Sequence, residues 1–170
     1  EENIDMPLQM SKLTYSLNAI ADYYGVPVIV STHPRTQKRI DEQDLNFHKN
    51  IKFIKPLGFF DYNNLQKNAK ATLSDSGTIN EESSIMNFPS LNIREAHERP
   101  EAMEETSVMM VGLDSQIILQ GLQILDSQPR GDKRLLRQVS DYSMPNVSDK
   151  VVRIIYSYTD YIKRVVWKEF

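Results

Sequence analysis

The segment from Ser74 to Thr78 has the residue types of a phosphate-binding turn. It reads Ser-Asp-Ser-Gly-Thr, follows a short β-rich run and precedes a helical pattern. A small-residue turn at a helix N-terminus exposes backbone N–H groups and the positive end of the helix dipole, which suits a phosphate. The hydroxyls of Ser76 and Thr78 could donate to the same oxygens. We therefore predict phosphate binding by Ser76, Gly77 and Thr78, with a simple capped helix and a turn glycine as the alternative.

Two acidic residues and one arginine could complete such a site. Glu81 and Glu82 stand one turn into the same helix and point in different directions, so at most one faces the turn. A carboxylate there would accept hydrogen bonds from two ribose hydroxyls, whereas the alternative is a pair of solvated charges. The charged segment 94–101 follows another predicted strand. In it, Arg99 could bind a phosphate bidentately.

Other loops carry residues that could face the same rim. His33 lies in a basic loop after a predicted strand, and Tyr62 ends an aromatic loop whose rings could stack on a base or belong to the core. His97 could donate to a phosphate or relay a proton. The histidines, His33, His48 and His97, show no metal-ligand spacing, so we predict no metal and no cofactor. Together these loops predict a nucleotide-diphosphate site.

Alternating short strands and helices must position these loops. After a first helix that Gly25 ends, we predict strands at 26–32, 51–54, 71–73, 90–93 and 107–111. The helices predicted between and after them cover 36–42, 61–69 (capped by Asp61), 79–87, about 115–125 (capped by Asp114 or Ser115) and 147–170. This alternation favours a Rossmann-like α/β fold, a mostly parallel sheet with helices on both faces, in which ligands bind beyond the carboxyl ends of the strands. We expect residues 1–145 to form this domain, with a polar loop or loosely held helix from 128 to 145, and residues 146–170 to form a long terminal helix.

Composition narrows the class of protein. The chain has 170 residues, of which 40% are hydrophobic and 25% charged, and its net charge is −3. This balance gives nucleic acid or anionic lipid no broad basic surface. The absence of cysteine excludes disulfides and thiolate zinc sites and fits a reducing compartment, so we expect a cytoplasmic protein. The apolar runs are too short to span a bilayer, and the acidic start, which lacks an initiator Met, is unlike a signal peptide.

Joined together, the motifs resemble those of the non-hydrolysing UDP-N-acetylglucosamine 2-epimerases. Residues 74–82, SDSGTINEE, and 97–101, HERPE, match the family patterns S-D-S-G-G-x-x-E-E and T-E-R-P-E. The opening Glu-Glu-Asn is similar to the end of the family's H-R-x-E-N motif, and the likeness covers essentially the whole chain. The resemblance implies the C-terminal half of a GT-B-type two-domain fold that holds a UDP-sugar in the cleft between its halves. The terminal helix would pack toward the missing N-terminal domain, and a homodimer is expected.

The resemblance also assigns roles residue by residue. The residues that it assigns to the diphosphate are Ser76, Gly77, Thr78 and Arg99. Glu82 would bind the ribose hydroxyls, and Tyr62 lies where the family stacks an aromatic ring on uracil. Glu2, as a candidate catalytic residue, and His33, as a substrate-binding residue, are weaker assignments near the cleft.

The implied reaction inverts C2 of a UDP-2-acetamido sugar by elimination and re-addition of UDP. The acid–base groups would belong to the missing half, so this chain alone should bind UDP without turnover. Thr78 and His97 depart from the family pattern and, with the stretch 58–63, are similar to the branch that forms UDP-N-acetyl-L-fucosamine. A GT-B glycosyltransferase and a non-enzymatic nucleotide-sensing or assembly domain remain as alternatives.

Overall fold

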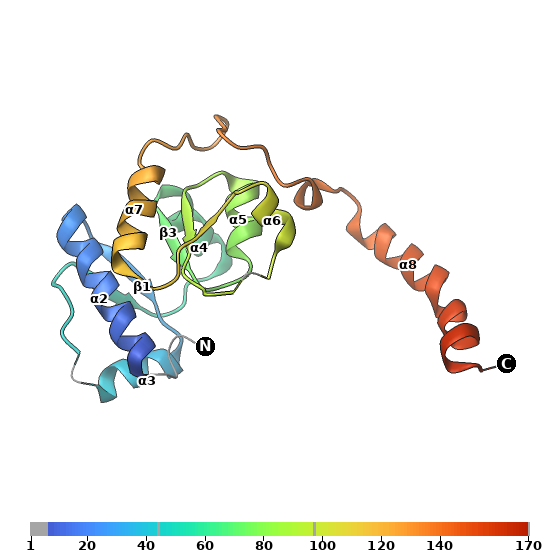
Figure 1. Cartoon of the computed structure of the whole chain (residues 1–170), viewed down its shortest axis with the longest axis horizontal. Coiled ribbons are helices and arrows are strands. Elements are labelled where there is room, and N and C mark those ends of the chain that lie inside the picture. The colour runs from blue at the N-terminus through green and yellow to red at the C-terminus, as the bar shows by residue number, and fades with distance from the viewer. Residues whose placement is uncertain (1–6, 44, 97, 170) are drawn as a thin grey trace. The chain divides into compact units, whose positions relative to one another are not determined.

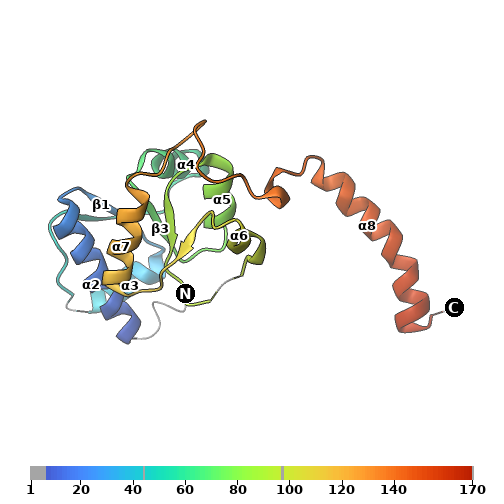
Figure 2. The ribbon, with the colours of Figure 1, turned by 45° about the horizontal axis from the view of Figure 1, so that its top comes forward.

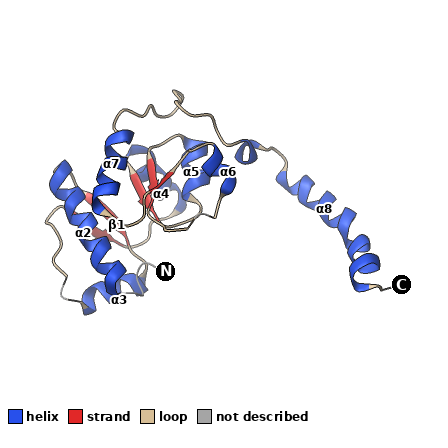
Figure 3. Cartoon of the chain, in the orientation of Figure 1, coloured by secondary structure: helices blue, strands red, loops and turns tan. Residues whose placement is uncertain are grey.

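The computed structural model describes residues 7–43, 45–96 and 98–169. The chain divides after Val139 into an α/β unit and a C-terminal helical unit. Figure 1 follows the alternation of helices and strands along the α/β unit, and Figure 3 shows the strands among the helices. All pairings between the described strands are parallel, which confirms the predicted α/β fold class.

The first part of the α/β unit contains two strands and two helices. Helix α2 (Pro7–Tyr24) ends at Gly25, whose φ of +64° suits glycine. Strand β1 (Val28–Ser31) pairs with β2 (Ile51–Ile54), with Val28 opposite Ile51. Helix α3 (Pro34–Glu42) follows β1 and begins with a proline, whose fixed φ favours a first helical turn.

The second part carries a separate three-stranded sheet of order β3–β4–β5. Its strands are β3 (Thr72–Ser74), β4 (Ser90–Asn92) and β5 (Met109–Met110). The helices that precede, connect and follow them are α4 (Phe59–Asn68), α5 (Ile79–Met86), α6 (Pro100–Glu104) and α7 (Ser115–Leu125). Because the strands are parallel, the segments after β3 and β4 leave the sheet at the same edge.

The main core forms where α7 and α2 pack beside the three-stranded sheet, and Figure 2 shows these two helices side by side. Its buried members are Ile20, Leu91, Ile93, Leu113, Ile118, Leu122 and Leu125. Gly121 allows close approach, because a Cβ there would lie 3.2 Å from both methyl groups of Leu91. Leu91 is fully buried, so Leu91→Ala would cost about 2–5 kcal/mol.

Several local predictions need correction. Helix α4 begins after Gly58, so Asp61 lies in its first turn and is not the cap. The five strands form two sheets, because the observed strands are short and the first two pair only with each other. Helix α6 was not predicted, since five residues carry too little periodicity to detect. By contrast, Asp114 caps α7, accepting from the amides of Gln116 and Ile117 at 2.9 and 3.1 Å.

The polar segment from Pro129 to Val139, here called the strap, forms neither helix nor strand and is held by side-chain hydrogen bonds. Arg134 donates to the carbonyls of Ser84 and Ile85, both at 2.7 Å, near the end of α5. Arg130 donates in the same way to the carbonyls of Ala69 and Lys70, after α4. Cations at helix C-termini satisfy carbonyls that the helix leaves unpaired. The strap therefore caps the end of α5 and holds the segment that follows α4.

The C-terminal unit consists of a short 3₁₀ turn (Ser140–Ser143), helix α8 (Val147–Ile162) and a π-helical turn (Lys163–Trp167). None of the described residues of α8 is buried. Its exposed apolar side chains include Val147, Val151, Ile154, Ile155 and Tyr158. None of the described helices combines the length and apolar character needed to cross a membrane.

Candidate nucleotide-diphosphate site

The turn between β3 and α5 brings two hydroxyls together at a helix N-terminus. The hydroxyls of Ser76 and Thr78 lie 2.9 Å apart, within hydrogen-bond distance. The backbone N–H of Ser76 donates to Ser74 Oγ at 3.1 Å, which tightens the turn as it leaves the strand. Thr78 is the N-cap residue of α5, yet its side chain makes no capping bond within the described part of the chain. The paired hydroxyls therefore stand at the positive end of the α5 dipole, as a phosphate site requires.

Gly77 allows the loop after β4 to lie against this turn. A Cβ on Gly77 would lie 3.2 Å from Glu98 Oε2 and 3.7 Å from Arg99 Nη2. The φ of Gly77 is outside the left-handed region, so the backbone conformation does not itself require glycine. Space, and not backbone conformation, therefore limits the size of a side chain here, because it would enter the region between the turn and the Arg99 guanidinium.

Arg99, which precedes α6, is oriented by the carboxylate of Glu81 on α5. Its Nε donates to Glu81 Oε1 at 2.8 Å, while Nη1 donates to the carbonyl of Glu98 at 3.3 Å. A second arginine, Arg94, donates to Glu98 Oε1 at 2.6 Å, and this bond holds the pKa of Glu98 below its usual value. These bonds fix the orientation of the Arg99 guanidinium, a group whose planar geometry suits a phosphate.

A second group of side chains joins α4 to the start of α5. Glu82 Oε2 accepts a hydrogen bond of 2.7 Å from Nε2 of Gln66, which is 3% exposed. Tyr62 stands one helical turn before Gln66 on α4 and is half-buried. Burial raises the pKa of Tyr62, and the nearby negative charge of Glu82 raises it further. The phenol therefore stays neutral at physiological pH, beside a carboxylate that can accept hydroxyl hydrogen bonds.

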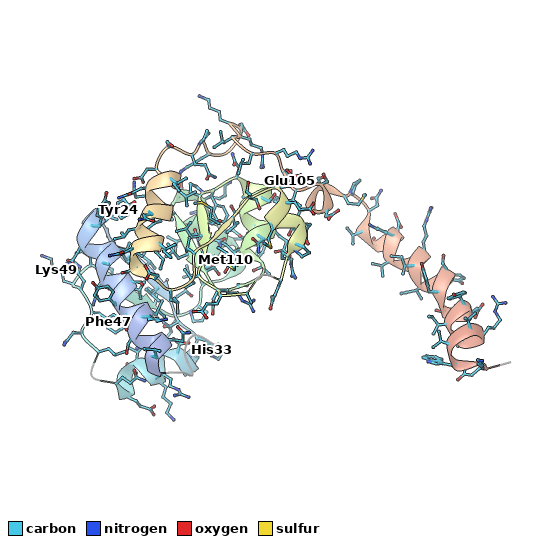
Figure 4. The ribbon with its side chains drawn as sticks, in the orientation of Figure 1. Tyr24, His33, Phe47, Lys49, Glu105 and Met110 are labelled. Atoms are coloured by element: carbon cyan, nitrogen blue, oxygen red, sulfur yellow. The ribbon has the colours of Figure 1, made fainter. Side chains whose placement is uncertain are left out.

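The structure gathers most of the predicted site residues. The residues that these contacts bring to one edge of the three-stranded sheet are Ser76, Gly77, Thr78, Glu82, Arg99 and Tyr62. His33, labelled in Figure 4, instead follows β1 of the other sheet and is exposed. Its carbonyl accepts a hydrogen bond from the Gln37 amide. Glu2 and His97 lie outside the described residues.

Sequence reasoning missed Glu81 and Gln66. It assigned no partner to Glu81, although Glu81 holds Arg99 from one side of α5 while Glu82 meets α4 on another. The signal for Gln66 was its position four residues after Tyr62, on the same helical face. Among the described residues, no group of three or more His, Asp or Glu side chains is placed to hold a metal ion.

Known proteins resemble this chain along most of its length. The family model described as UDP-N-acetylglucosamine 2-epimerase matches residues 1–156. A curated protein of that name from Methanocaldococcus jannaschii is 30% identical over 158 residues, which cover 91% of this chain and 42% of the relative.

Solved structures agree with this match. The UDP-N-acetylglucosamine 2-epimerase of Rickettsia bellii is 41% identical, with a TM-score of 0.84 over 99% of this chain and 45% of that one. The M. jannaschii enzyme in complex with UDP-GlcNAc and UDP is 29% identical, with a TM-score of 0.79 over 92% of this chain and 42% of that one. The chain thus spans less than half the length of these relatives. On the evidence of its motifs, its fold and these matches, the chain belongs to the UDP-N-acetylglucosamine 2-epimerase family.

Proposed function

We propose that this chain is the UDP-binding half of a UDP-sugar 2-epimerase. The observation that carries the proposal is the gathering of a hydroxyl-lined turn, an oriented arginine and a carboxylate–aromatic pair at one sheet edge. In this assignment the diphosphate binds Ser76, Gly77, Thr78 and Arg99. Glu82 accepts the ribose hydroxyls, and uracil stacks on Tyr62. Family relatives solved with UDP-GlcNAc and UDP support this choice of ligand.

The contribution of this half to catalysis would be electrostatic. Epimerisation at C2 requires removal of the C2 proton while UDP departs, followed by return of UDP and protonation from the other face. The departing oxygen gains negative charge, which the α5 N-terminus and Arg99 can stabilise because both are in place beforehand. The same contacts would retain UDP until it adds back. Acid–base groups from the rest of the whole protein would move the proton, so this chain alone should bind UDP without turnover.

The identity of the sugar is a more specific part of the proposal. Thr78 stands where the family pattern has a second glycine, and its hydroxyl is paired with that of Ser76. This extra side chain, together with the stretch 58–63, favours the branch that forms UDP-N-acetyl-L-fucosamine from a 6-deoxy sugar nucleotide. Comparing the turnover of UDP-GlcNAc with that of the 6-deoxy sugar nucleotide in the whole protein would distinguish the two possible substrates. Preferred turnover of UDP-GlcNAc would exclude the fucosamine branch.

We also propose that α8 packs against the N-terminal domain of the whole protein. The whole protein would be a homodimer and would lie in the cytoplasm. Support for the packing comes from the exposed apolar side chains of α8, since a helix with such a stripe needs a partner surface. The cytoplasmic location rests on the cysteine-free sequence.

Calorimetric titration with UDP tests the binding site. Glu82→Gln removes the charge while its amide oxygen can still accept from Gln66, and Arg99→Ala removes the guanidinium. Each should weaken UDP binding by about 1.5–3 kcal/mol, the contribution of a hydrogen bond to a charged group. Glu42→Gln, which removes the same charge from exposed α3, is the matched control and should leave affinity unchanged. Unchanged affinity in both site variants would refute the assignment.

Solvent deuterium tests the reaction. In the whole protein, turnover in D₂O should place deuterium at C2 of the recovered sugar nucleotide, because the proton is exchanged at that carbon. A GT-B glycosyltransferase would transfer the sugar to an acceptor without this label. A whole protein with no turnover at all would favour a sensing or assembly role.

A further inference from the structure

A buried amide connects the two residues proposed to hold the nucleoside. Gln66 follows Tyr62 by four positions on α4, so both side chains share one helical face. Its Nε2 donates to Glu82 Oε2 at 2.7 Å, across the gap between α4 and α5. This is a hydrogen bond to a carboxylate, the stronger class of side-chain bond. Glu82 is itself only partly buried, so this bond restricts a carboxylate that solvent would otherwise leave mobile.

Gln66 is an unfavourable residue for a position that serves packing alone. Only 3% of the residue is exposed, and its Oε1 is buried without a hydrogen-bond partner among the residues that the structure describes. Burying an unsatisfied acceptor costs free energy that offsets the bond made by Nε2. A methionine of similar length would fill the same space without that cost. The buried acceptor offsets part of the bond to Glu82, and the Gln66 amide also lies within hydrogen-bonding reach of the Tyr62 phenol. The clearest consequence of this arrangement is the orientation of Glu82.

We propose that Gln66 is a positioning residue, which holds the Glu82 carboxylate toward the ribose hydroxyls and thereby gives the site its preference for ribonucleotides. This inference rests on the proposed function, because it takes Glu82 as the ribose ligand. Gln66 acts before the ligand arrives: it fixes one carboxylate orientation, so less conformational freedom is lost on binding.

The test compares two ligands that differ only in the ribose hydroxyls, UDP and 2′,3′-dideoxy-UDP. Gln66→Met should weaken UDP binding by about three- to tenfold, the range of a typical net hydrogen bond, and leave dideoxy-UDP binding unchanged. Thermal unfolding of the same samples checks that the variant keeps its fold. Gln123→Met makes the same chemical change on α7, where Gln123 donates to Tyr23 at an exposed site, and should change neither affinity.

A double-variant cycle separates positioning from general damage. In a Glu82→Ala background, Gln66→Met should cause no further loss of UDP affinity, because the carboxylate on which it acts is gone. Equal losses for UDP and dideoxy-UDP, an additive cycle, or unchanged UDP affinity in Gln66→Met would each overturn the inference and leave the proposed function standing. Failure of the wild-type chain to bind UDP would overturn the proposed function, and this inference with it.

Discussion

Gly77→Ala should leave the fold stable while it reduces the space available to a diphosphate. The added Cβ would lie 3.2 Å from Glu98 Oε2, and 3.7 and 3.8 Å from Nη2 and Cζ of Arg99. The first contact is tight by a few tenths of an ångström, but it meets the end of a flexible side chain that is 48% exposed. Because the Gly77 backbone is outside the left-handed region, alanine brings no conformational strain there. Loss of chain entropy in the unfolded state favours the variant by about 0.4–1 kcal/mol, which offsets the displaced carboxylate.

Binding should respond differently from stability. The methyl group would occupy the space between the turn and the Arg99 guanidinium, where the proposal places the diphosphate. Losing one charged hydrogen bond to a phosphate oxygen corresponds to about 1.5–3 kcal/mol, or roughly tenfold to a hundredfold in affinity. Calorimetric titration with UDP measures the loss, and thermal unfolding of the same samples checks the fold. Gly58→Ala is the control, since a Cβ there meets nothing within 4 Å. Wild-type affinity in a folded Gly77→Ala chain would refute the placement of the diphosphate.

Two further predictions concern stability. Arg134→Met removes two bonds of 2.7 Å to the carbonyls of Ser84 and Ile85, and should lower the free energy of unfolding by about 1–3 kcal/mol in urea titrations; an unchanged midpoint and slope would show that the strap does not cap α5. The folded-state pKa of Tyr62 is raised, chiefly by burial, so its contribution to stability is fully present below the unfolded-state pKa of about 10 and is lost as pH rises through the folded value. Melting points between pH 8 and 11 should therefore fall more steeply in the wild type than in Tyr62→Phe, and parallel curves would contradict this reasoning.

Local signals in the sequence were sufficient to predict several of the elements that carry the site. The strand at 51–54 and the start of α5 at Ile79 occur where they were predicted, because apolar runs and a small-residue turn mark them without help from distant contacts. The cap of α7 was narrowed to Asp114 or Ser115 for the same reason, and Asp114 is the one whose bonds reach residues two and three positions away.

The contacts that shape the site could not be predicted in this way. Arg99 and Glu81 are 18 positions apart, and Gln66 and Glu82 are 16 apart, so each pairing depends on how two elements pack. The sequence offered two adjacent glutamates and a loop arginine, with no means of deciding which carboxylate would meet which partner. Likewise, the close approach at position 77 comes from the loop after β4 and not from the turn's own backbone.

Mapping the UDP site by amide chemical shifts in solution would test the central claim most directly. Adding UDP to the isotopically labelled chain should shift the backbone amides of Ser76, Gly77 and Thr78, together with those around Tyr62 and Glu82. Amides of the exposed β1–α3 loop around His33 should move little, because that loop follows the other sheet. Shifts confined to that loop, or no shifts at millimolar UDP, would contradict the claim that the edge formed by the turn, α4 and α5 binds the nucleotide.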